Sequence, residues 1–332
     1  MATRYHRSGS TATIERILVP DLSPARPPSE EPAERQISLD GVSFTYFDWP
    51  ASDGNPAARA VVLAHATGFH GRTWDAVARL LPGLRVLALD LRGHGRSDST
   101  GEPESWEIFG VDTANFVRAL DLHGAIGVGH SMGGHSVTIA AKREPQAFGG
   151  LLLVDPVMPL DRRPPREGQG GASDFVRKRR NEWASPDEMI ERFKDRFPYS
   201  AWRPEVLDDY ARWGLLPNPD GEGFVLACSP DMEGGTYAAS GNGPAMGTEV
   251  IPFIHVPVTV MRGKQPIPGE PGVPFSTSPT PPQLASLFVD GEDVLLPGLS
   301  HFIPMEAPEV VAEQVLALDA RVRARTDGSA EG

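Results

Sequence analysis

Residues 129–133 of this chain read Gly-His-Ser-Met-Gly and match G-x-S-x-G, the pattern that surrounds a nucleophilic serine. An apolar run at 125–129 leads into the serine, and a helical pattern at 133–144 follows it. A serine on a tight turn between a strand and a helix lies at the carboxyl edge of a sheet, where the helix dipole favours developing negative charge. The spacing therefore predicts that Ser131 is a nucleophile.

Apolar strands and helical patterns alternate on both sides of this motif and must position it. The expected elements around it are, in chain order, a hairpin at 36–39 and 42–47, a strand at 60–64, a helix at 73–81, a strand at 84–89, a helix at 105–120 and a strand at 151–154. Strands joined by crossover helices run parallel, so the pattern predicts an α/β fold with helices on both faces of the sheet.

The alternation stops after Asp155 and resumes with a strand at 256–261. The residues between are first rich in Pro and Gly, at 159–171, and then helical, at about 172–214, where Ser185-Pro186-Asp187-Glu188 forms a capping box. The expected pattern ends with a helix at 282–288, a strand at 293–296 and a helix at 308–323.

These elements predict an α/β core at 36–156 and 251–325 that is interrupted by a helical insertion at 157–250. Residues 1–35 carry five prolines between positions 20 and 32 and are expected to be a flexible arm. A flexible tail is expected at 326–332.

The composition narrows the classes of partner. The 332 residues include 31 Lys and Arg against 44 Asp and Glu, and the net charge of −13 disfavours binding to nucleic acid or to an anionic membrane. The basic run Arg177-Lys178-Arg179-Arg180 is interpreted as a solvated helix face. Cys228 is the only cysteine, which excludes an intrachain disulfide. Since no long apolar run and no apolar signal segment is present, we expect a cytoplasmic protein with no membrane partner.

Four segments in this order resemble the α/β-hydrolase superfamily, and the likeness covers nearly all of residues 40–325. The segments are His65-Ala66-Thr67-Gly68-Phe69, Asp90-Leu91-Arg92-Gly93-His94-Gly95-Arg96-Ser97, Gly129-His130-Ser131-Met132-Gly133-Gly134 and Pro297-Gly298-Leu299-Ser300-His301-Phe302. The resemblance implies a mostly parallel eight-stranded sheet and a helical cap. It also implies that these segments are an oxyanion loop, the loop after the preceding strand, a nucleophile elbow and the segment of the catalytic histidine.

His301 is the predicted base. It follows the expected strand at 293–296 and a Pro-Gly turn, so it would lie beside the elbow at the same sheet edge. The order of serine before histidine is also the one that this fold uses. The histidines at positions 65, 94 and 130 are expected to shape loops near the site.

Two backbone N–H groups must bind the oxyanion of the tetrahedral intermediate. One is expected from Met132, the residue after the nucleophile. Thr67 matches the family position for the other, with Gly68 as the alternative. Ala66 stands where the family usually has glycine.

The acid of the triad must hold the histidine in one tautomer and stabilise its cation. The family most often carries it after the strand that here is 256–261, but Gln265 stands there, in a segment with seven prolines between positions 266 and 282. The other acid position in this fold is the end of the strand after the elbow helix, which here is Asp155. We predict Asp155 as the acid; the alternatives are Glu270 and, more weakly, Glu292 and Asp293.

The insertion is placed to cover the site and to supply apolar walls. Its candidates for substrate contact are Phe175, Trp183, Trp202, Tyr210, Trp213 and Met232.

A Ser-His-Asp triad beneath a cap predicts hydrolysis of a small or medium, partly apolar carboxylic ester through an acyl-enzyme. A lactonase, a thioesterase, an amidase, a carbon–carbon bond hydrolase, a haloperoxidase-like enzyme without a cofactor, and a slow or non-catalytic ligand-binding relative remain alternatives. A serine at position 131 argues against epoxide hydrolase and haloalkane dehalogenase activity, which need a carboxylate nucleophile. No metal or dinucleotide cofactor is expected, because the sequence has neither a His-Glu-x-x-His motif nor a Gly-x-Gly-x-x-Gly motif after a strand. The oligomeric state is left open.

Overall fold

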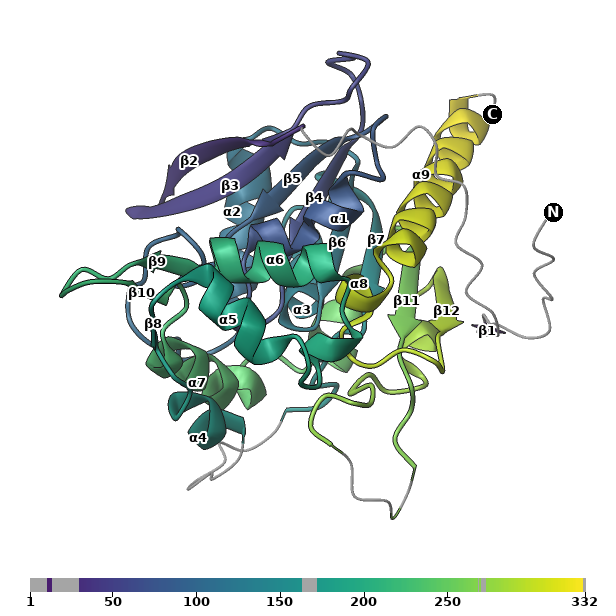
Figure 1. Ribbon diagram of the computed structural model, residues 1–332. Coiled ribbons are helices and arrows are strands. Elements are labelled where there is room, and N and C mark those ends of the chain that lie inside the picture. Colours follow the sequence, from purple (N-terminus) through teal and green to yellow (C-terminus); the bar gives the residue numbers. More distant parts are fainter. Residues whose placement is uncertain (1–10, 14–29, 163–171, 268, 270–272, 331–332) are drawn as a thin grey trace.

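One large sheet forms the centre of the computed structural model, which describes residues 11–13, 30–162, 172–267, 269 and 273–330 (Figure 1). Its nine strands lie in the spatial order β1-β12-β11-β7-β6-β4-β5-β3-β2. Their bounds are β1 Thr11–Thr13, β2 Ala33–Leu39, β3 Val42–Trp49, β4 Ala60–Ala64, β5 Arg85–Leu89, β6 Ala125–His130, β7 Phe148–Val154, β11 Val258–Arg262 and β12 Gly291–Leu295. From β1 to β5 in this order all neighbours are parallel, and β3 pairs antiparallel with β5 and β2.

Helices cover both faces of the sheet, as the alternating pattern predicted (Figure 1). The helices α2 (Glu107–Ala119) and α3 (Met132–Arg143) contribute to the apolar core on one face, and α1 (Asp75–Ala78) and α9 (Pro308–Ala330) to the core on the other. Successive strand residues point to opposite faces, so the neighbours Val61 and Val62 of β4 belong to different cores. The central strands are therefore buried on both sides.

The strand register brings the ends of three strands together. His130, the last residue of β6, pairs with Val154, the last residue of β7, and Val154 pairs in turn with Met261 of β11. Ser131 directly follows His130, and Asp155 directly follows Val154. The sheet thus places both side chains at one edge, although 23 positions separate them along the chain.

The structure corrects the predictions for the two ends of the chain. Within the predicted arm, Thr11–Thr13 forms β1 and pairs in parallel with β12, while residues 1–10 and 14–29 lie outside the described residues. Within the predicted tail, α9 continues to Ala330, and only 331–332 lie outside the described residues. Ala and Arg are strong helix formers and recur at 320–325, which supports this extension of the helix.

Two predicted helices are shorter than expected. The segment 73–81 forms a 3₁₀ turn at Gly71–Trp74 and a single α-turn, α1, before Pro82. The segment 282–288 forms only a 3₁₀ helix at Leu284–Leu287, because β12 begins four residues later and leaves no room for more turns.

The described part of the insertion contains four α-helices, and it also contains a small sheet that the sequence patterns did not predict. The helices are α4 (Ala172–Arg177), α5 (Pro186–Phe193), α6 (Pro204–Trp213) and α7 (Pro230–Ala238), and the antiparallel strands β8 (Glu182–Trp183), β10 (Phe224–Leu226) and β9 (Leu215–Pro217) lie in that order. Strands of two or three residues are too short to show a periodicity. At Ser185 half of the predicted capping box is present, because the side chain of that residue accepts a hydrogen bond from the Glu188 backbone at 3.1 Å, whereas the Glu188 carboxylate accepts from the Ala184 backbone at 2.9 Å.

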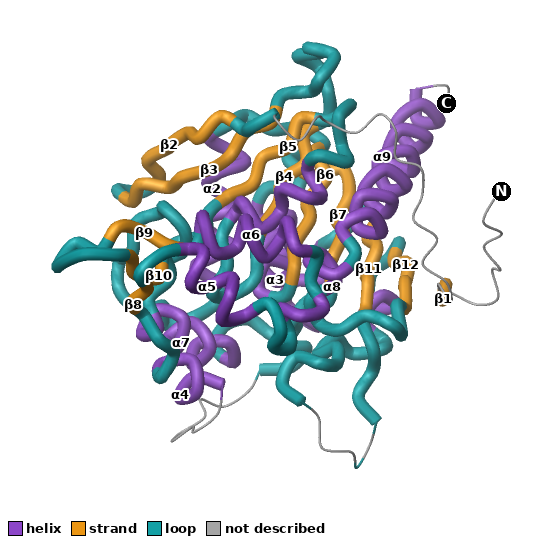
Figure 2. Tube along the Cα trace, in the orientation of Figure 1, coloured by secondary structure: helices purple, strands orange, loops and turns teal. Residues whose placement is uncertain are grey.

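The insertion and one long loop flank the same edge of the sheet. Figure 1 shows α5 and α6 in front of the sheet, with α4 and α7 below them. Figure 2 shows the described parts of the segment between β11 and β12 mostly as loop, at the lower right. Residues 163–171, predicted as a loop, lie outside the described residues.

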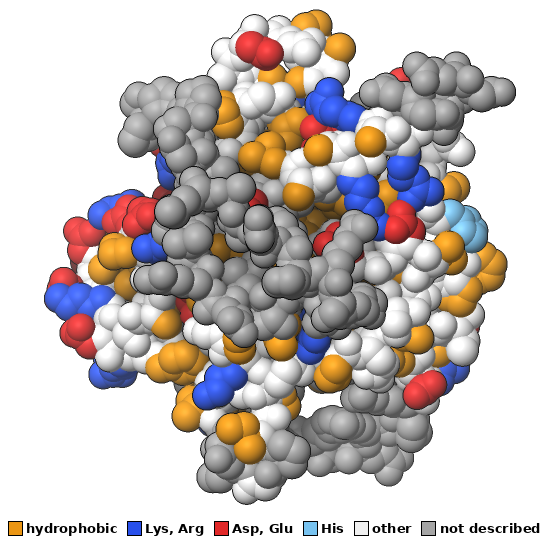
Figure 3. Space-filling view, turned by 90° about the vertical axis from the view of Figure 1, so that its right-hand side faces the viewer, with side chains coloured by type: hydrophobic (Ala, Val, Ile, Leu, Met, Phe, Trp, Pro, Cys, Tyr) orange, Lys and Arg blue, Asp and Glu red, His pale blue; other side chains and the backbone are white. Residues whose placement is uncertain are grey.

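Charges of both signs are interspersed on the molecular surface. On the face in Figure 3, where undescribed residues do not cover it, acidic and basic side chains lie next to one another. Among the described residues, no helix is long and apolar enough to cross a membrane.

Candidate active site

Ser131 lies on the turn between β6 and α3 in a backbone conformation that few side chains adopt, with φ 55° and ψ −114°. Two glycines make this turn possible. A Cβ on Gly133 would lie 2.0 Å from the Ala64 carbonyl oxygen, and one on Gly129 would lie 2.2 Å from the Gly133 carbonyl oxygen. The turn therefore requires glycine at both positions, and it holds Ser131 at the sheet edge with 6% of its surface exposed.

Asp155 and His301 are joined by a hydrogen bond. Asp155 follows β7 with φ 44°, and its carboxylate oxygen Oδ2 lies 2.7 Å from Nδ1 of His301. Both side chains are buried, to 0% and 4% exposure. A buried carboxylate at Nδ1 selects the tautomer in which Nδ1 carries the proton and Nε2 is free to accept one.

The long loop after β11 holds the other oxygen of this carboxylate. Oδ1 of Asp155 accepts hydrogen bonds from the Gly263 backbone at 3.1 Å, from the Thr280 hydroxyl at 3.2 Å and from the Ser278 hydroxyl. The proline-rich segment at 266–282 thus ends in two hydroxyl donors to Asp155. In place of an acid, this loop supplies donors that orient a carboxylate from the neighbouring strand.

The alternative acids are engaged elsewhere or lie outside the described residues. Asp293 forms a buried ion pair with Arg262, with 2.5 and 2.6 Å contacts. The exposed Glu292 pairs with Arg321 at 3.4 Å. Glu270 lies outside the described residues. Of the four candidates, only Asp155 contacts His301 among the residues that are described.

His301 is also held through its backbone. Its carbonyl oxygen lies 2.8 Å from Nε2 of His130, and its N–H donates to the Phe275 carbonyl at 3.2 Å. Burial, together with the nearby His301, lowers the pKa of His130 well below its ordinary value. A neutral His130 therefore donates a hydrogen bond from Nε2 to the His301 carbonyl oxygen. This bond helps to hold the backbone of His301 in place.

A similar histidine holds the loop after β4. Nδ1 of His65 lies 2.8 Å from the Ala66 carbonyl, and its Nε2 accepts a 3.0 Å hydrogen bond from the Leu91 backbone. Burial and the neighbouring His94 keep the pKa of His65 well below its ordinary value, so the ring is neutral with its proton on Nδ1. This bond ties the loop to the segment after β5.

The two residues predicted for the oxyanion hole are neighbours. The Thr67 hydroxyl donates to Sδ of Met132 at 3.4 Å. Met132 is the first residue of α3, where an N–H has no acceptor within the helix. Thr67 lies in a turn closed by a 3.2 Å bond from the Phe69 N–H to the Ala66 carbonyl, with Gly68 at φ 79°.

A cavity of about 490 Å³ opens above these residues. Thr67, Ser131 and His301 line it, together with four of the predicted cap residues, Phe175, Trp183, Trp202 and Tyr210. Further aromatic residues that the sequence patterns did not single out complete the walls: Phe69, Phe193, Phe197, Tyr199, Tyr237, Phe275 and Phe302. The cavity is therefore a largely aromatic chamber over the serine.

Trp213 and Met232 do not line this cavity, which corrects their prediction as substrate contacts. The Trp213 ring lies between two guanidinium groups, of Arg72 at 3.8 Å and Arg96 at 4.4 Å. Trp213 ends α6 on the side that faces the core, so its ring joins the cap to the core. The sequence marked an aromatic cap residue but not the direction in which it points.

The position of Arg179 shows that a second prediction was wrong. The basic run 177–180 was expected to be solvated, but the Arg179 side chain is only 20% exposed and lines the cavity. Its guanidinium donates to the Glu233 carboxylate and, at 2.9 Å, to the Tyr210 hydroxyl. Lys178 next to it is exposed, as expected. Only the three-dimensional fold shows which cation of such a run points inward.

The described residues contain no group of three or more His, Cys, Asp and Glu side chains arranged to hold a metal ion.

Comparison with curated proteins finds relatives that are named as a peroxidase and as an esterase. A non-heme chloroperoxidase of Streptomyces lividans is 38% identical over 124 residues, which are 36% of this chain and 44% of that protein. The match thus spans less than half of that relative. A bifunctional esterase/perhydrolase of Acinetobacter calcoaceticus is 26% identical over 290 residues, which are 84% of this chain and 96% of that protein.

Solved structures share the architecture. A thioesterase domain from the curacin biosynthetic pathway covers 86% of this chain and all of its own, with a TM-score of 0.65 and 20% identity. The E-2-(acetamidomethylene)succinate hydrolase covers 87% of this chain and 99% of its own, with a TM-score of 0.66 and 19% identity. At such identities the likeness shows the fold alone.

A family model described as "Alpha/beta hydrolase family" matches residues 61–314, which include Ser131, Asp155 and His301. Because this match covers most of the chain, the protein belongs to the alpha/beta hydrolase family.

Proposed function

We propose that this protein is a serine hydrolase that cleaves a small or medium, partly apolar carboxylic ester through an acyl-enzyme. Ser131 is the nucleophile, His301 the base and Asp155 the acid of its triad. The observation that carries the proposal is the 2.7 Å hydrogen bond between Asp155 and His301, at a cavity that His301 and Ser131 both line. A buried carboxylate that holds a histidine, and a strained serine that lines the same cavity as this histidine, are the parts that such chemistry needs.

In the first half-reaction, Oγ of Ser131 attacks the ester carbonyl carbon while Nε2 of His301 takes the hydroxyl proton. The tetrahedral intermediate then expels the alcohol, which leaves with the proton from His301, and the acyl group stays on Ser131. In the second half-reaction, His301 removes a proton from a water molecule that attacks the acyl group and returns that proton to Ser131. Asp155 stabilises the imidazolium in both halves.

The negative oxygen of each intermediate needs donors that are already in place. The Met132 N–H, at the start of α3, points out of the helix at its positive end. We assign the second donor to the Thr67 N–H, and the turn at Gly68 supports this because it fixes the backbone around Thr67.

The substrate class follows from the cavity. A volume of about 490 Å³ accommodates a small or medium molecule, and the walls are mostly aromatic. A chamber of this kind beneath a cap suits a discrete ester better than a polymer or the surface of a fat droplet.

Activity on a panel of p-nitrophenyl esters, lactones and thioesters tests this proposal. We expect turnover of the short and medium p-nitrophenyl esters, and Ser131→Ala should reduce it by at least about 10⁴-fold. Faster turnover of lactones or thioesters would change the substrate class, and a folded protein without activity on the whole panel would contradict the proposal.

Perhydrolysis is a second candidate, favoured by the relative named esterase/perhydrolase that spans 84% of this chain. Hydrogen peroxide would take the place of water in the second half-reaction, attack the acyl group on Ser131 and release a peracid. Peracid formation from an ester and peroxide, lost in Ser131→Ala, would establish this activity beside hydrolysis.

A further inference from the structure

Arginines dominate the charged part of the cavity lining. Four of them line it, at positions 179, 180, 192 and 196, whereas Glu233 is the one carboxylate among the described lining residues. This excess of positive charge is opposite in sign to the net charge of −13 for the whole chain. A local reversal of charge at a cavity indicates which ligands it favours.

Two of these arginines are already paired. Arg179 donates to Glu233 and to the Tyr210 hydroxyl, which neutralises the one carboxylate of the lining. Arg180 pairs with Glu188 and lies 4.4 Å from the centre of the Trp183 ring. The cations that remain available are therefore the other two.

Among the described residues, neither Arg192 nor Arg196 forms an ion pair with a carboxylate, although the charge of Arg192 acts on Glu188, the partner of Arg180. Arg192 lies in the last turn of α5 and Arg196 just beyond it, and both are exposed. Ser131 lines the same cavity but is only 6% exposed. The two arginines and the serine thus line the same largely aromatic cavity, the arginines with exposed side chains and the serine with a buried one.

We propose that the ester substrate of this site carries a carboxylate at the end away from the scissile bond, and that Arg192 and Arg196 bind it. This inference rests on the proposed ester hydrolysis. Guanidinium groups match the planar geometry of a carboxylate, and the aromatic walls suit an apolar middle segment. The substrate class is then a half-ester of a dicarboxylic acid or an ester whose leaving group carries a carboxylate.

Matched pairs of esters test this proposal. Mono-4-nitrophenyl glutarate and 4-nitrophenyl valerate share a leaving group and acyl length and differ in the carboxylate. For an anion on the leaving group, 3-acetoxybenzoate and 3-acetoxybenzamide form a second pair. We expect the anionic member of at least one pair to have the higher kcat/KM, by about tenfold.

The double variant Arg192→Gln/Arg196→Gln should lower that preference by roughly fivefold or more, chiefly through a lower kcat/KM for the anionic esters. Lys194→Gln is the matched control, because Lys194 lies between the two arginines and does not line the cavity. It should leave the preference intact. Neutral esters that are hydrolysed as well as anionic ones, or a preference that survives the double variant, would overturn the inference.

A binding measurement separates this outcome from failure of the proposed function. Calorimetric titration of the full chain with glutarate should show binding that weakens about fivefold or more in the double variant. If neither member of any pair is hydrolysed, ester hydrolysis fails, and glutarate binding still decides whether the arginines form an anion site. Equal glutarate affinity in wild type and double variant would contradict the site itself.

Discussion

At the scale of single residues, the site depends on two non-glycine residues with positive φ, Ser131 at 55° and Asp155 at 44°. Such conformations cost free energy and persist only where the surroundings fix them. For Ser131 the surroundings are the two glycines of the turn. For Asp155 they are the backbone bond from its N–H to Met261 and the three donors to Oδ1.

Replacing Asp155 tests its proposed role as the acid of the triad. Asp155→Asn should keep the fold but lower kcat by on the order of 10⁴-fold, because an amide leaves His301 in the wrong tautomer. The measurement is kcat on the best ester of the panel, with circular dichroism as the check on folding. Glu292→Gln is the control, since Glu292 is exposed and pairs only with Arg321 in the described part of the chain. Full activity in Asp155→Asn would refute the assignment.

Replacing a glycine of the turn tests the strained geometry. Gly133→Ala would place a Cβ 2.0 Å from a backbone oxygen and should reduce the free energy of unfolding by about 3 kcal/mol or abolish activity through a displaced turn. Gly83→Ala, where a Cβ meets no atom within 4 Å, should be nearly neutral. Chemical denaturation and kcat of both variants compare them, and similar stability together with similar activity would argue against a tight turn.

The motifs at Ser131 and His301 are local in sequence and were therefore predictable. The contact between His301 and Asp155 was reached only by excluding the loop at Gln265, since the three donors to Asp155 come from a segment more than 100 positions away. The inward direction of Arg179 and the core-facing direction of Trp213 depend on how helices pack, which residue type does not report.

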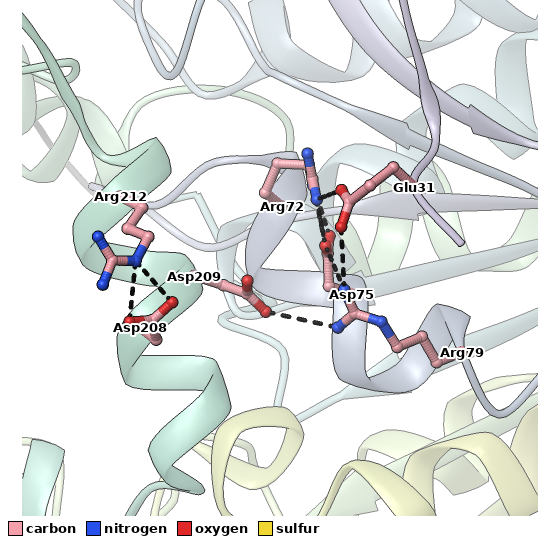
Figure 4. Close-up of polar contacts among 7 residues, drawn as sticks. All are labelled: Glu31, Arg72, Asp75, Arg79, Asp208, Asp209 and Arg212. Carbon is pink, nitrogen blue, oxygen red and sulfur yellow. Dashed lines mark hydrogen bonds and ion pairs between the residues drawn. The ribbon is translucent and has the colours of Figure 1, made fainter. Parts of the chain in front are cut away.

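At the scale of elements, a network of charges joins the cap helix α6 to the core (Figure 4). Arg72 and Arg79 contact Asp75 on the core side at 2.6 and 3.5 Å, and Glu31 contacts both arginines. Asp209 of α6 faces this cluster, 3.9 Å from Arg79. Burial, and then the nearby Asp75, raise the pKa of Asp209 to about 8.

This raised pKa predicts how stability depends on pH. The folded state binds a proton at Asp209 more tightly than the unfolded state, in which the pKa is near 3.8, so its contribution to stability falls as pH rises from about 4 to about 8. Asp209→Asn removes this loss and should make the protein more stable relative to wild type at pH 8 than at pH 5, by at least about 1 kcal/mol.

Denaturant unfolding of wild type and Asp209→Asn at both pH values is the measurement. Asp208→Asn serves as the control, because Asp208 pairs with Arg212 on the same helix, away from the cluster. An identical pH dependence of stability in wild type and Asp209→Asn would show that Asp209 does not hold its proton in the folded protein.

The helices and strands with a clear hydrophobic periodicity were predicted from the sequence, and the short strands of the insertion were not. The helix expected at 105–120 and the strand at 60–64 are present as α2 and β4, because each has enough residues to show its pattern. The strands of the cap sheet have two or three residues, and two of them, β8 and β10, pair across more than 40 positions of the chain. Tertiary packing rather than local pattern forms them.

At the scale of the whole molecule, a net charge of −13 coexists with a cavity that arginines line. The negative charge of the whole chain and the positive charge at the cavity act oppositely on an anionic substrate. The net charge repels it at a distance, and the unpaired arginines attract it at the cavity.

The dependence of the rate on ionic strength shows whether the cavity arginines or the net charge of the chain has the larger effect. If Arg192 and Arg196 dominate, raising NaCl from about 50 mM to about 500 mM should lower kcat/KM for the anionic ester relative to its neutral partner, because salt screens exposed charges. The double arginine variant should lack this dependence. A relative rate that rises with salt in the wild type would mean that the overall negative charge prevails.

The central claim, that Ser131 is an activated nucleophile, is tested most directly by labelling with a fluorophosphonate probe and intact-protein mass spectrometry. We predict one adduct per chain on the wild type, located at Ser131 by peptide mapping, none on Ser131→Ala, and slower labelling of Asp155→Asn. A folded wild-type protein that does not react with the probe, or an adduct that persists in Ser131→Ala, would contradict the account.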